Sequence, residues 1–420
     1  MHQKTTLDNG LRIVTTTMAH TRSVSIYFFI GVGSRFESDA EAGISHFIEH
    51  VLFRGTAQRK TAKEISEAIE GVGGFLNGGT DKEMTLYWAR VSQDHFPLAL
   101  DVLADVYQHS RFEAEDIEKE RQIIVEEINM TRDSPHQQVH MLIDSLLWPG
   151  HPLGRDIAGT KESMAGITRD MMLGYLDNKY LPENTVIAIA GNIGHEGVVE
   201  AVSKAFSGWK NNNSGLEFLP YTGQPNPRLE IEKRDTEQVH LCLGLPGLEL
   251  KHPDRYALDL MNVILGEGMS SRLFTEIRDN LGLAYSIHSY IDHLHDSGSL
   301  VIYAGVEPAN LSVAVRAITG QLASLKDTIT EAELSKAQEL TRGRMLLRME
   351  DTRSVAGWMG GQEVLIGEIM TVDQVLAKVN TVTIEQMQGL ANELITSEQL
   401  RLSVVGPVGE DESLEELLKI

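Results

Sequence analysis

Apolar residues with two different periods divide the first half of the chain into strands and helices. Val24–Val32 and Thr185–Ala190 are rich in β-branched and other apolar residues, as buried strands are. In Ala42–Phe53 the apolar positions follow the spacing of an amphipathic helix, and longer helical patterns cover residues 93–109 and 113–147. This mixture predicts a unit in which helices pack on a β-sheet.

Turn residues locate the shorter strands. Asp8-Asn9-Gly10 predicts a tight hairpin between Thr5–Leu7 and the alternating run Leu11–Thr15. Two further strands are predicted near Phe75–Thr80 and Met84–Val91.

The second half repeats the order of elements of the first half. Val239–Leu245 corresponds to Val24–Ile30, and Leu400–Val405 corresponds to Thr185–Ala190. An Asn-, Gly- and Pro-rich stretch between the halves has the composition of a linker. We therefore predict an α+β fold with two duplicated α/β-sandwich-like units, each a mixed, mostly antiparallel sheet with helices packed on it. The predicted ranges are 1–210 for the first unit, 211–228 for the linker and 229–420 for the second unit.

Charge and cysteine content exclude several classes of protein. The 420 residues include 60 acidic and 37 basic ones, and the resulting net charge of −23 disfavours binding to nucleic acids or anionic membranes. Cys242 is the single cysteine, which excludes an intrachain disulfide framework and a cysteine-based metal site. The first residues lack the apolar core of a signal peptide, so a cytoplasmic location is expected.

The pentapeptide His46-Phe-Ile-Glu49-His50 carries the strongest chemical signal. Residues four apart lie on one face of a helix, so both imidazoles can reach one metal ion, and Glu49 can act as a general base beside it. Two surface histidines on a helix are the alternative interpretation. His136/His140 and His293/His295 also have ligand spacing, but neither pair has a carboxylate placed as Glu49 is, and both are interpreted as structural or solvent-facing.

With two glutamates further along the chain, this pentapeptide resembles the inverted-motif zinc peptidases of the pitrilysin/insulinase family. In that family the third ligand is a glutamate 77 positions after the second histidine, which is Glu127 here, and a supporting glutamate lies seven residues before it, which is Glu120 here. The resemblance implies one Zn²⁺ per chain held by His46, His50 and Glu127, with Glu49 as the base. A purely structural zinc site is the alternative, but such sites usually have four protein ligands.

Other segments extend the resemblance over most of the chain. Leu7–Val14, Phe53-Arg-Gly-Thr56 and Gly73–Thr80 match the opening hairpin, the end of the zinc helix and the substrate-pairing edge strand of the family. The length resembles the short-chain members that are similar to mitochondrial processing peptidase and its bacterial relatives. The resemblance implies that substrate contacts Phe53, Asn77, Gly78, Gly79 and Thr80. The family often has Ala where Gly78 stands, so its first specificity pocket is not carried over.

The second half contains a second set of candidate residues. Its equivalent of the zinc helix, around Asp254–Leu265, has no metal-binding pentapeptide. The family grips substrate with an arginine and a tyrosine seven residues apart, and Arg278 and Tyr285 have that spacing. From the residues alone, a structural ion pair at Arg278 and a half-buried Tyr285 are the simpler interpretation. The resemblance implies that both contact the substrate near the scissile bond.

The resemblance therefore implies a zinc-dependent endopeptidase that hydrolyses extended peptides or leader segments inside an enclosed chamber. The alternative is a non-catalytic structural or binding subunit of the same fold. A homodimer is expected, in which the zinc of one chain meets Arg278 and Tyr285 of the other, although a heterodimer stays open. Peptides are the expected partners, and neither nucleic acid nor membrane is expected.

Overall fold

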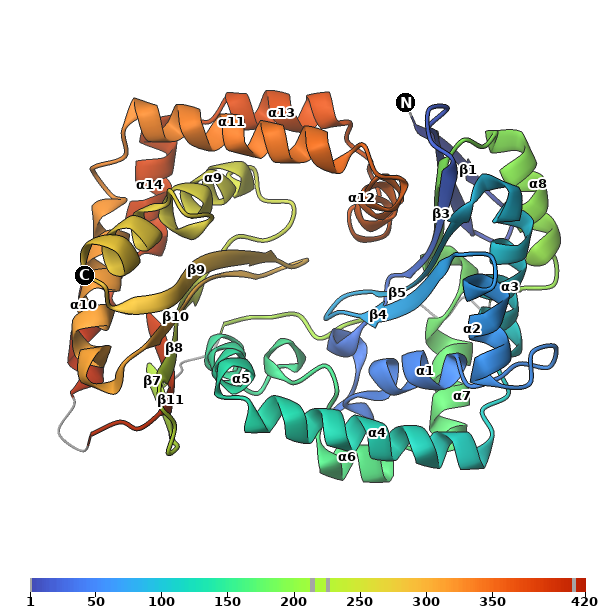
Figure 1. Ribbon diagram of the computed structural model, residues 1–420, viewed down its shortest axis with the longest axis horizontal. Coiled ribbons are helices and arrows are strands. Elements are labelled where there is room, and N and C mark those ends of the chain that lie inside the picture. The colour runs from blue at the N-terminus through green and yellow to red at the C-terminus, as the bar shows by residue number, and fades with distance from the viewer. Residues whose placement is uncertain (1, 212–215, 224–226, 410–412) are drawn as a thin grey trace. The chain divides into compact units, whose positions relative to one another are not determined.

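The protein folds into two compact units, each organised around one β-sheet (Figure 1). The computed structural model describes residues 2–211, 216–223, 227–409 and 413–420. Unit 1 comprises Met1–Asn129, Asp156–Leu219 and Leu346–Thr371, and unit 2 comprises Met130–Arg155, Pro220–Met345 and Val372–Ile420. Of the predicted linker 211–228, residues 212–215 and 224–226 lie outside the described residues, and the described ones form no helix or strand.

Unit 1 contains a six-stranded sheet in the order β1-β2-β6-β3-β5-β4. The β2–β6 pair is parallel and every other neighbouring pair is antiparallel. The predicted hairpin at Asp8–Gly10 is confirmed, because it joins β1 to β2. The strands are β1 (His2–Thr6), β2 (Arg12–Thr17), β3 (Ser23–Ile30), β4 (Phe75–Thr80), β5 (Thr85–Ser92) and β6 (Thr185–Gly191).

Unit 2 contains a five-stranded sheet with the same topology. Its order is β7-β11-β8-β10-β9, with β7 and β11 parallel and the other pairs antiparallel. Without its edge strand β1, the sheet of unit 1 has the same order, because β2, β6, β3, β5 and β4 correspond to β7, β11, β8, β10 and β9. The shared order confirms the duplicated, mostly antiparallel α+β architecture. The strands are β7 (Leu229–Lys233), β8 (Val239–Pro246), β9 (Ala284–His293), β10 (Gly298–Val306) and β11 (Arg401–Gly406).

Helices cover the sheets and bury the apolar side chains of both. Helices of unit 1 are α1 (Ile44–Leu52), α2 (Ala62–Glu70), α3 (Phe96–His109), most of α4 (Ala114–Asp133), α6 (Lys161–Gly166), α7 (Arg169–Lys179), α8 (His195–Ala205) and α12 (Thr352–Leu365). Those of unit 2 are α5 (Pro135–Leu147), α9 (Arg255–Gly266), a π-helix (Phe274–Asn280), α10 (Leu311–Ser324), most of α11 (Glu331–Arg348), α13 (Val372–Asn380) and α14 (Ile384–Leu394). Within the described parts of the chain, no helix is both long and apolar enough to span a bilayer.

Each half of the sequence contributes one helix to the unit formed mainly by the other half. The continuous helical pattern predicted over 113–147 is interrupted at Ser134, because Pro135 has no N–H to continue α4 and instead occupies the first turn of α5. Helix α5 then packs on β8 and β11 of unit 2. The approach is close at Gly244, where an added Cβ would lie 2.8 Å from Cγ1 of Ile143.

Helix α12 makes the reciprocal exchange and packs on β3 and β6 of unit 1 (Figure 1). A Cβ at Gly360 would lie 2.1 Å from the Phe29 ring, so the helix can approach the sheet only because Gly360 has no side chain. Glu363 is buried on the same helix and pairs with Lys4 (2.5 Å) and Arg12 (3.3 Å). The sequence-based ranges 1–210 and 229–420 flank the division at 219/220, but they place α5 in the first unit and α12 in the second, whereas each helix belongs to the other unit.

Candidate metal centre

Helix α1 is fixed at its first turn by a buried carboxylate. Gly43, at φ +91°, precedes the helix, and a Cβ there would lie 2.5 Å from the Ala158 carbonyl oxygen. The N–H groups of Gly43 and Ser45 donate to Glu37 at 2.8 and 2.9 Å, which satisfies free donors at the positive end of the helix. Phe47, Ile48 and Val51 are buried in the core of unit 1. The opposite face therefore carries His46, Glu49 and His50 in a fixed orientation.

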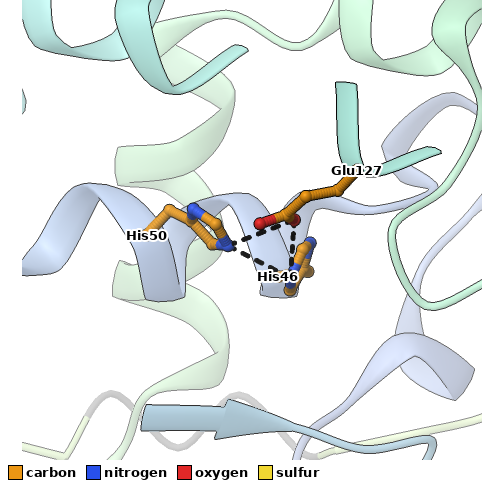
Figure 2. A group of neighbouring side chains, drawn as sticks. All are labelled: His46, His50 and Glu127. Carbon is orange, nitrogen blue, oxygen red and sulfur yellow. Dashed lines mark hydrogen bonds and ion pairs between the residues drawn. The ribbon is translucent and has the colours of Figure 1, made fainter. Parts of the chain in front are cut away.

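Three side chains from α1 and α4 converge on one point (Figure 2). The Nε2 atoms of His46 and His50 are 3.2 Å apart, and Oε2 of Glu127 lies 3.8 Å from the first and 3.6 Å from the second. A tetrahedral zinc with bonds of about 2.0–2.1 Å separates its ligand atoms by about 3.3 Å. The observed distances therefore fit a single ion, and three protein ligands leave one coordination position open, as in catalytic zinc sites.

Glu120 lies behind this cluster and joins two cationic or basic groups. Its Oε2 atom is 2.8 Å from Nδ1 of His50, and its Oε1 atom pairs with the guanidinium of Arg54. Only 4% of Glu120 is exposed. A carboxylate on Nδ1 fixes the ring orientation and directs Nε2 of His50 toward the cluster. The structure thus places Glu120 where the sequence predicted a supporting carboxylate.

The two histidines have opposite pKa shifts. Burial, followed by the nearby His50, lowers the pKa of His46 to about 4, so His46 is neutral at pH 7 and can act as a ligand. Burial also opposes the charge on His50, but the hydrogen bond to Glu120 and the charges of Glu127, Glu120 and Glu49 outweigh it and raise the pKa of His50. Nδ1 of His46 is buried without a hydrogen-bond partner among the described residues. Only His50 has the supporting carboxylate.

Glu49 lies beside the cluster, against the edge strand β4. Thr80 Oγ1 donates a hydrogen bond of 2.6 Å to Oε2 of Glu49. Burial raises the pKa of Glu49, whereas the Thr80 hydrogen bond and His50 lower it and Glu127 raises it, with a net upward shift. A general base needs a pKa closer to neutrality than an exposed carboxyl group has, so the direction of this shift suits that task.

The other residues predicted to contact substrate lie around β4, which forms one edge of the unit 1 sheet. Asn77, Gly78, Gly79 and Thr80 belong to this strand. Phe53 follows α1, and its ring makes an edge-to-face contact with Tyr87 of the adjacent strand at 5.8 Å between centroids. An edge strand can pair with an extended peptide through its main chain.

Arg278 and Tyr285 lie together in unit 2. Arg278 is on the π-helix and Tyr285 is near the start of β9. The guanidinium carbon of Arg278 lies 4.9 Å from the Tyr285 ring centroid and 4.6 Å from that of Phe274. Tyr285 is 78% exposed rather than half-buried, and both residues line a cavity of about 340 Å³ with Glu307.

The remaining histidine pairs have structural contacts. His140 contacts Tyr290 through a 2.8 Å hydrogen bond and lies with His136 beside the Tyr303 ring. His293 bonds to the Leu248 carbonyl oxygen and to Asp259. Among the described residues, His46, His50 and Glu127 form the one group of three or more potential ligands whose atoms are close enough to share a metal ion.

Sequence reasoning missed two contacts at this site. It predicted that Thr80 contacts substrate and gave the Thr80 hydroxyl no further role, whereas this hydroxyl donates to Glu49. It gave no role to Arg54, although Arg54 lies within the Phe53-Arg-Gly-Thr56 segment that was recognised. The register of β4 and the rotamer of Arg54 determine these contacts, and spacing along the chain does not reveal either.

Known proteins and family models match nearly the whole length of this chain. The family model described as insulinase, peptidase family M16, matches residues 12–161, and the one described as peptidase M16 inactive domain matches residues 166–341. The uncharacterized zinc protease YmxG of Bacillus subtilis is 40% identical over 412 residues, which cover 97% of this chain and 99% of YmxG. A relative from Mycobacterium leprae, also described as an uncharacterized zinc protease, is 39% identical over 99% of this chain and 94% of its own length.

A solved structure shares the fold. The crystal structure of a protease from Helicobacter pylori superposes with a TM-score of 0.89 at 24% identity, and the match covers 97% of this chain and 99% of that one. A likeness at this level of identity shows the architecture of two units.

Proposed function

Because this chain belongs to the insulinase family of M16 peptidases, we propose that it is a zinc-dependent endopeptidase with its metal held by His46, His50 and Glu127. The convergence of these three ligand atoms, with Glu49 next to them, is the observation that carries the proposal. The relatives described as zinc proteases support the peptidase class and the identity of the metal. The second half lacks the pentapeptide, in keeping with the description of its matching family model as an inactive domain.

In this mechanism each residue around the cluster has a separate task. Bound zinc supplies Lewis-acid polarisation of the scissile carbonyl and increases the acidity of the attacking water. Glu49 accepts the proton from that water and passes it to the leaving amine. Glu120 holds the His50 ring in the orientation that directs Nε2 to the metal.

The proposed substrates are extended peptides or leader segments. Strand β4 lies at a sheet edge close to Glu49, so a peptide that adds to this edge would present its backbone to the base. Main-chain pairing tolerates many sequences and needs an unfolded segment. The presence of Gly78 and Gly79 in β4 leaves little side-chain bulk along this edge. We also propose that the peptide is enclosed in a chamber. Such a chamber would exclude folded proteins.

We propose further that the active form is a homodimer with composite sites. The zinc cluster belongs to unit 1, whereas Arg278 and Tyr285 belong to unit 2. In a two-fold dimer, each zinc cluster would be completed by Arg278 and Tyr285 of the partner. The guanidinium offers planar donors to peptide carbonyls, and the exposed phenol can stabilise a developing oxyanion. A chain with both sets needs no separate partner.

The second candidate function is a non-catalytic subunit of the same fold. The presence of Glu49 beside a complete ligand set favours the enzyme. The test is zinc content and cleavage of quenched peptides by wild type and Glu49→Gln, with and without a chelator. The enzyme hypothesis expects about one zinc per chain in both proteins and turnover in wild type alone, abolished by the chelator. Turnover retained by Glu49→Gln would contradict the assigned base.

A further inference from the structure

The edge strand β4 contacts the base of the proposed reaction through two positions on one face. Residues two apart on a strand share a face, so Gly78 and Thr80 both face α1, which packs against β4. Thr80 Oγ1 donates to Oε2 of Glu49 at 2.6 Å. A Cβ on Gly78 would lie 2.9 Å from Cγ and 3.1 Å from Oε1 of the same glutamate.

These contacts restrict where the Glu49 carboxylate can lie. A glutamate side chain has several rotamers, and a proton acceptor must be held close to one productive position. The Thr80 hydroxyl engages Oε2, which leaves Oε1 to take the proton. Phe53 borders the same space, because a Cβ on Gly78 would also lie 3.1 Å from its ring. Glu49 is therefore held by a hydrogen-bond donor, and its side chain lies close to Gly78.

We propose that Thr80 is a positioning residue for Glu49. This inference rests on the proposed peptidase function, and it adds a role for the Thr80 side chain to the substrate contact predicted for this residue. The pairing of Gly78 with Tyr87 and of Thr80 with Thr85 fixes the strand, so the hydroxyl is held against Glu49 by the sheet.

The first experiment compares Thr80→Val with Thr80→Ser. Valine keeps the shape but removes the donor, and we expect kcat to fall about 10- to 100-fold, as for the loss of a hydrogen bond to a charged group, with KM and zinc content little changed. Serine keeps the hydroxyl and should restore most of kcat. A raised KM with unchanged kcat would show a substrate contact instead and overturn the proposal. Equal losses in both variants would also overturn it.

A second measurement does not depend on activity. In the metal-free chain, Thr80→Val should change the melting temperature in the wild-type background but not in a Glu49→Ala background, because the partner is already absent. The same shift in both backgrounds would contradict the Thr80–Glu49 contact. If Thr80→Val does not fold, Thr80→Ala takes its place in both experiments, with Thr80→Ser as the control that keeps the hydroxyl.

The proposed function and this inference fail in different ways. Absence of chelator-sensitive turnover in the wild type, or retained turnover in Glu49→Gln, would reject the zinc peptidase itself. A wild-type kcat in Thr80→Val, with Glu49→Gln inactive, would reject only the positioning of Glu49 by Thr80.

Discussion

The carboxylate of Glu120 connects Arg54 to His50. One oxygen lies 2.8 Å from Nδ1 of His50 and the other pairs with the guanidinium of Arg54. Glu120 has little access to water, and the guanidinium of Arg54 supplies a compensating positive charge beside it. The orientation of a proposed zinc ligand thus depends on a residue that does not itself reach the cluster.

Replacement of Arg54 should therefore weaken zinc binding. We expect Arg54→Ala to reduce zinc affinity about 10- to 100-fold, the usual effect of losing support behind a metal-binding histidine. Competition with a chromogenic chelator measures this directly. Arg54→Lys keeps the charge but loses the fork geometry and should have an intermediate effect. An unchanged affinity in Arg54→Ala would show that Glu120 orients His50 unaided.

Composite sites predict complementation between two inactive chains. One chain carries Glu49→Gln and the other carries Arg278→Ala together with Tyr285→Ala. After subunit exchange, half of the dimers are hybrids with one intact site, so activity should return to about one quarter of wild type. Each variant alone should be nearly inactive. Failure to recover activity despite proven exchange, or a fully active monomer, would reject the composite site.

The close approach of α12 to its sheet predicts different effects for two adjacent glycines. Gly360→Ala places a Cβ against Phe29 and Ala188 and should lower the free energy of unfolding by about 1–3 kcal/mol. Gly361 is the matched control, because an added Cβ there meets nothing within 4 Å and removes a helix-breaking residue. Gly361→Ala should be neutral or stabilise by up to about 1 kcal/mol. Urea unfolding of both variants tests the difference, and equal losses would contradict this packing.

The histidines of unit 2 predict reduced stability in mild acid. Burial, followed by the charges of His136, His288 and His240, lowers the pKa of His140 to about 4, against about 6.5 in an unfolded chain. Between these values the unfolded chain binds a proton that the folded chain does not. The free energy of unfolding therefore decreases as pH falls from 6.5 to 4, and above pH 6.5 this effect is absent.

His140→Gln should make that dependence shallower, by up to about 1.4 kcal/mol per pH unit for one proton. Urea unfolding of the metal-free chain between pH 8 and pH 4.5 measures it. At pH 8, where His140 does not titrate, the difference in the free energy of unfolding between variant and wild type gives the cost of the lost contact with Tyr290. Parallel curves for the two proteins would show that His140 does not titrate as described.

Local features of the fold could be predicted because they depend on nearby residues. The Asn9-Gly10 turn, the apolar face of α1 and the β4–β5 pair are encoded within a few residues each. The two halves also share one topology, which the order of predicted elements indicated. The break at Ser134-Pro135 was readable but was missed in a long helical pattern. The destinations of α5 and α12 were not readable, because each helix could cover either of two similar sheets.

The candidate site was predictable to a similar extent. Helical spacing identified His46 and His50, the family resemblance added Glu127, and the structure brings their ligand atoms together. The contact of Thr80 with Glu49 depends on which face of β4 meets α1, a tertiary property that no spacing expresses. Oligomeric composition is likewise a property of surfaces rather than of motifs, so the pairing of Arg278 and Tyr285 with a zinc cluster stays a prediction.

The exchange of α5 and α12 affects how the chain folds while it is being synthesised. Strands β3 and β6 are complete by Gly191. Helix α12, which covers them and approaches them closely at Gly360, is translated much later. At about 5–20 residues per second, the delay is roughly 10–30 s. During that interval one apolar face of the nascent sheet is uncovered, and Phe29 and Ala188 are open to non-native contacts. A ribosome-bound fragment that ends before Thr352 should therefore bind holdase chaperones, and extension past Leu365 should release them.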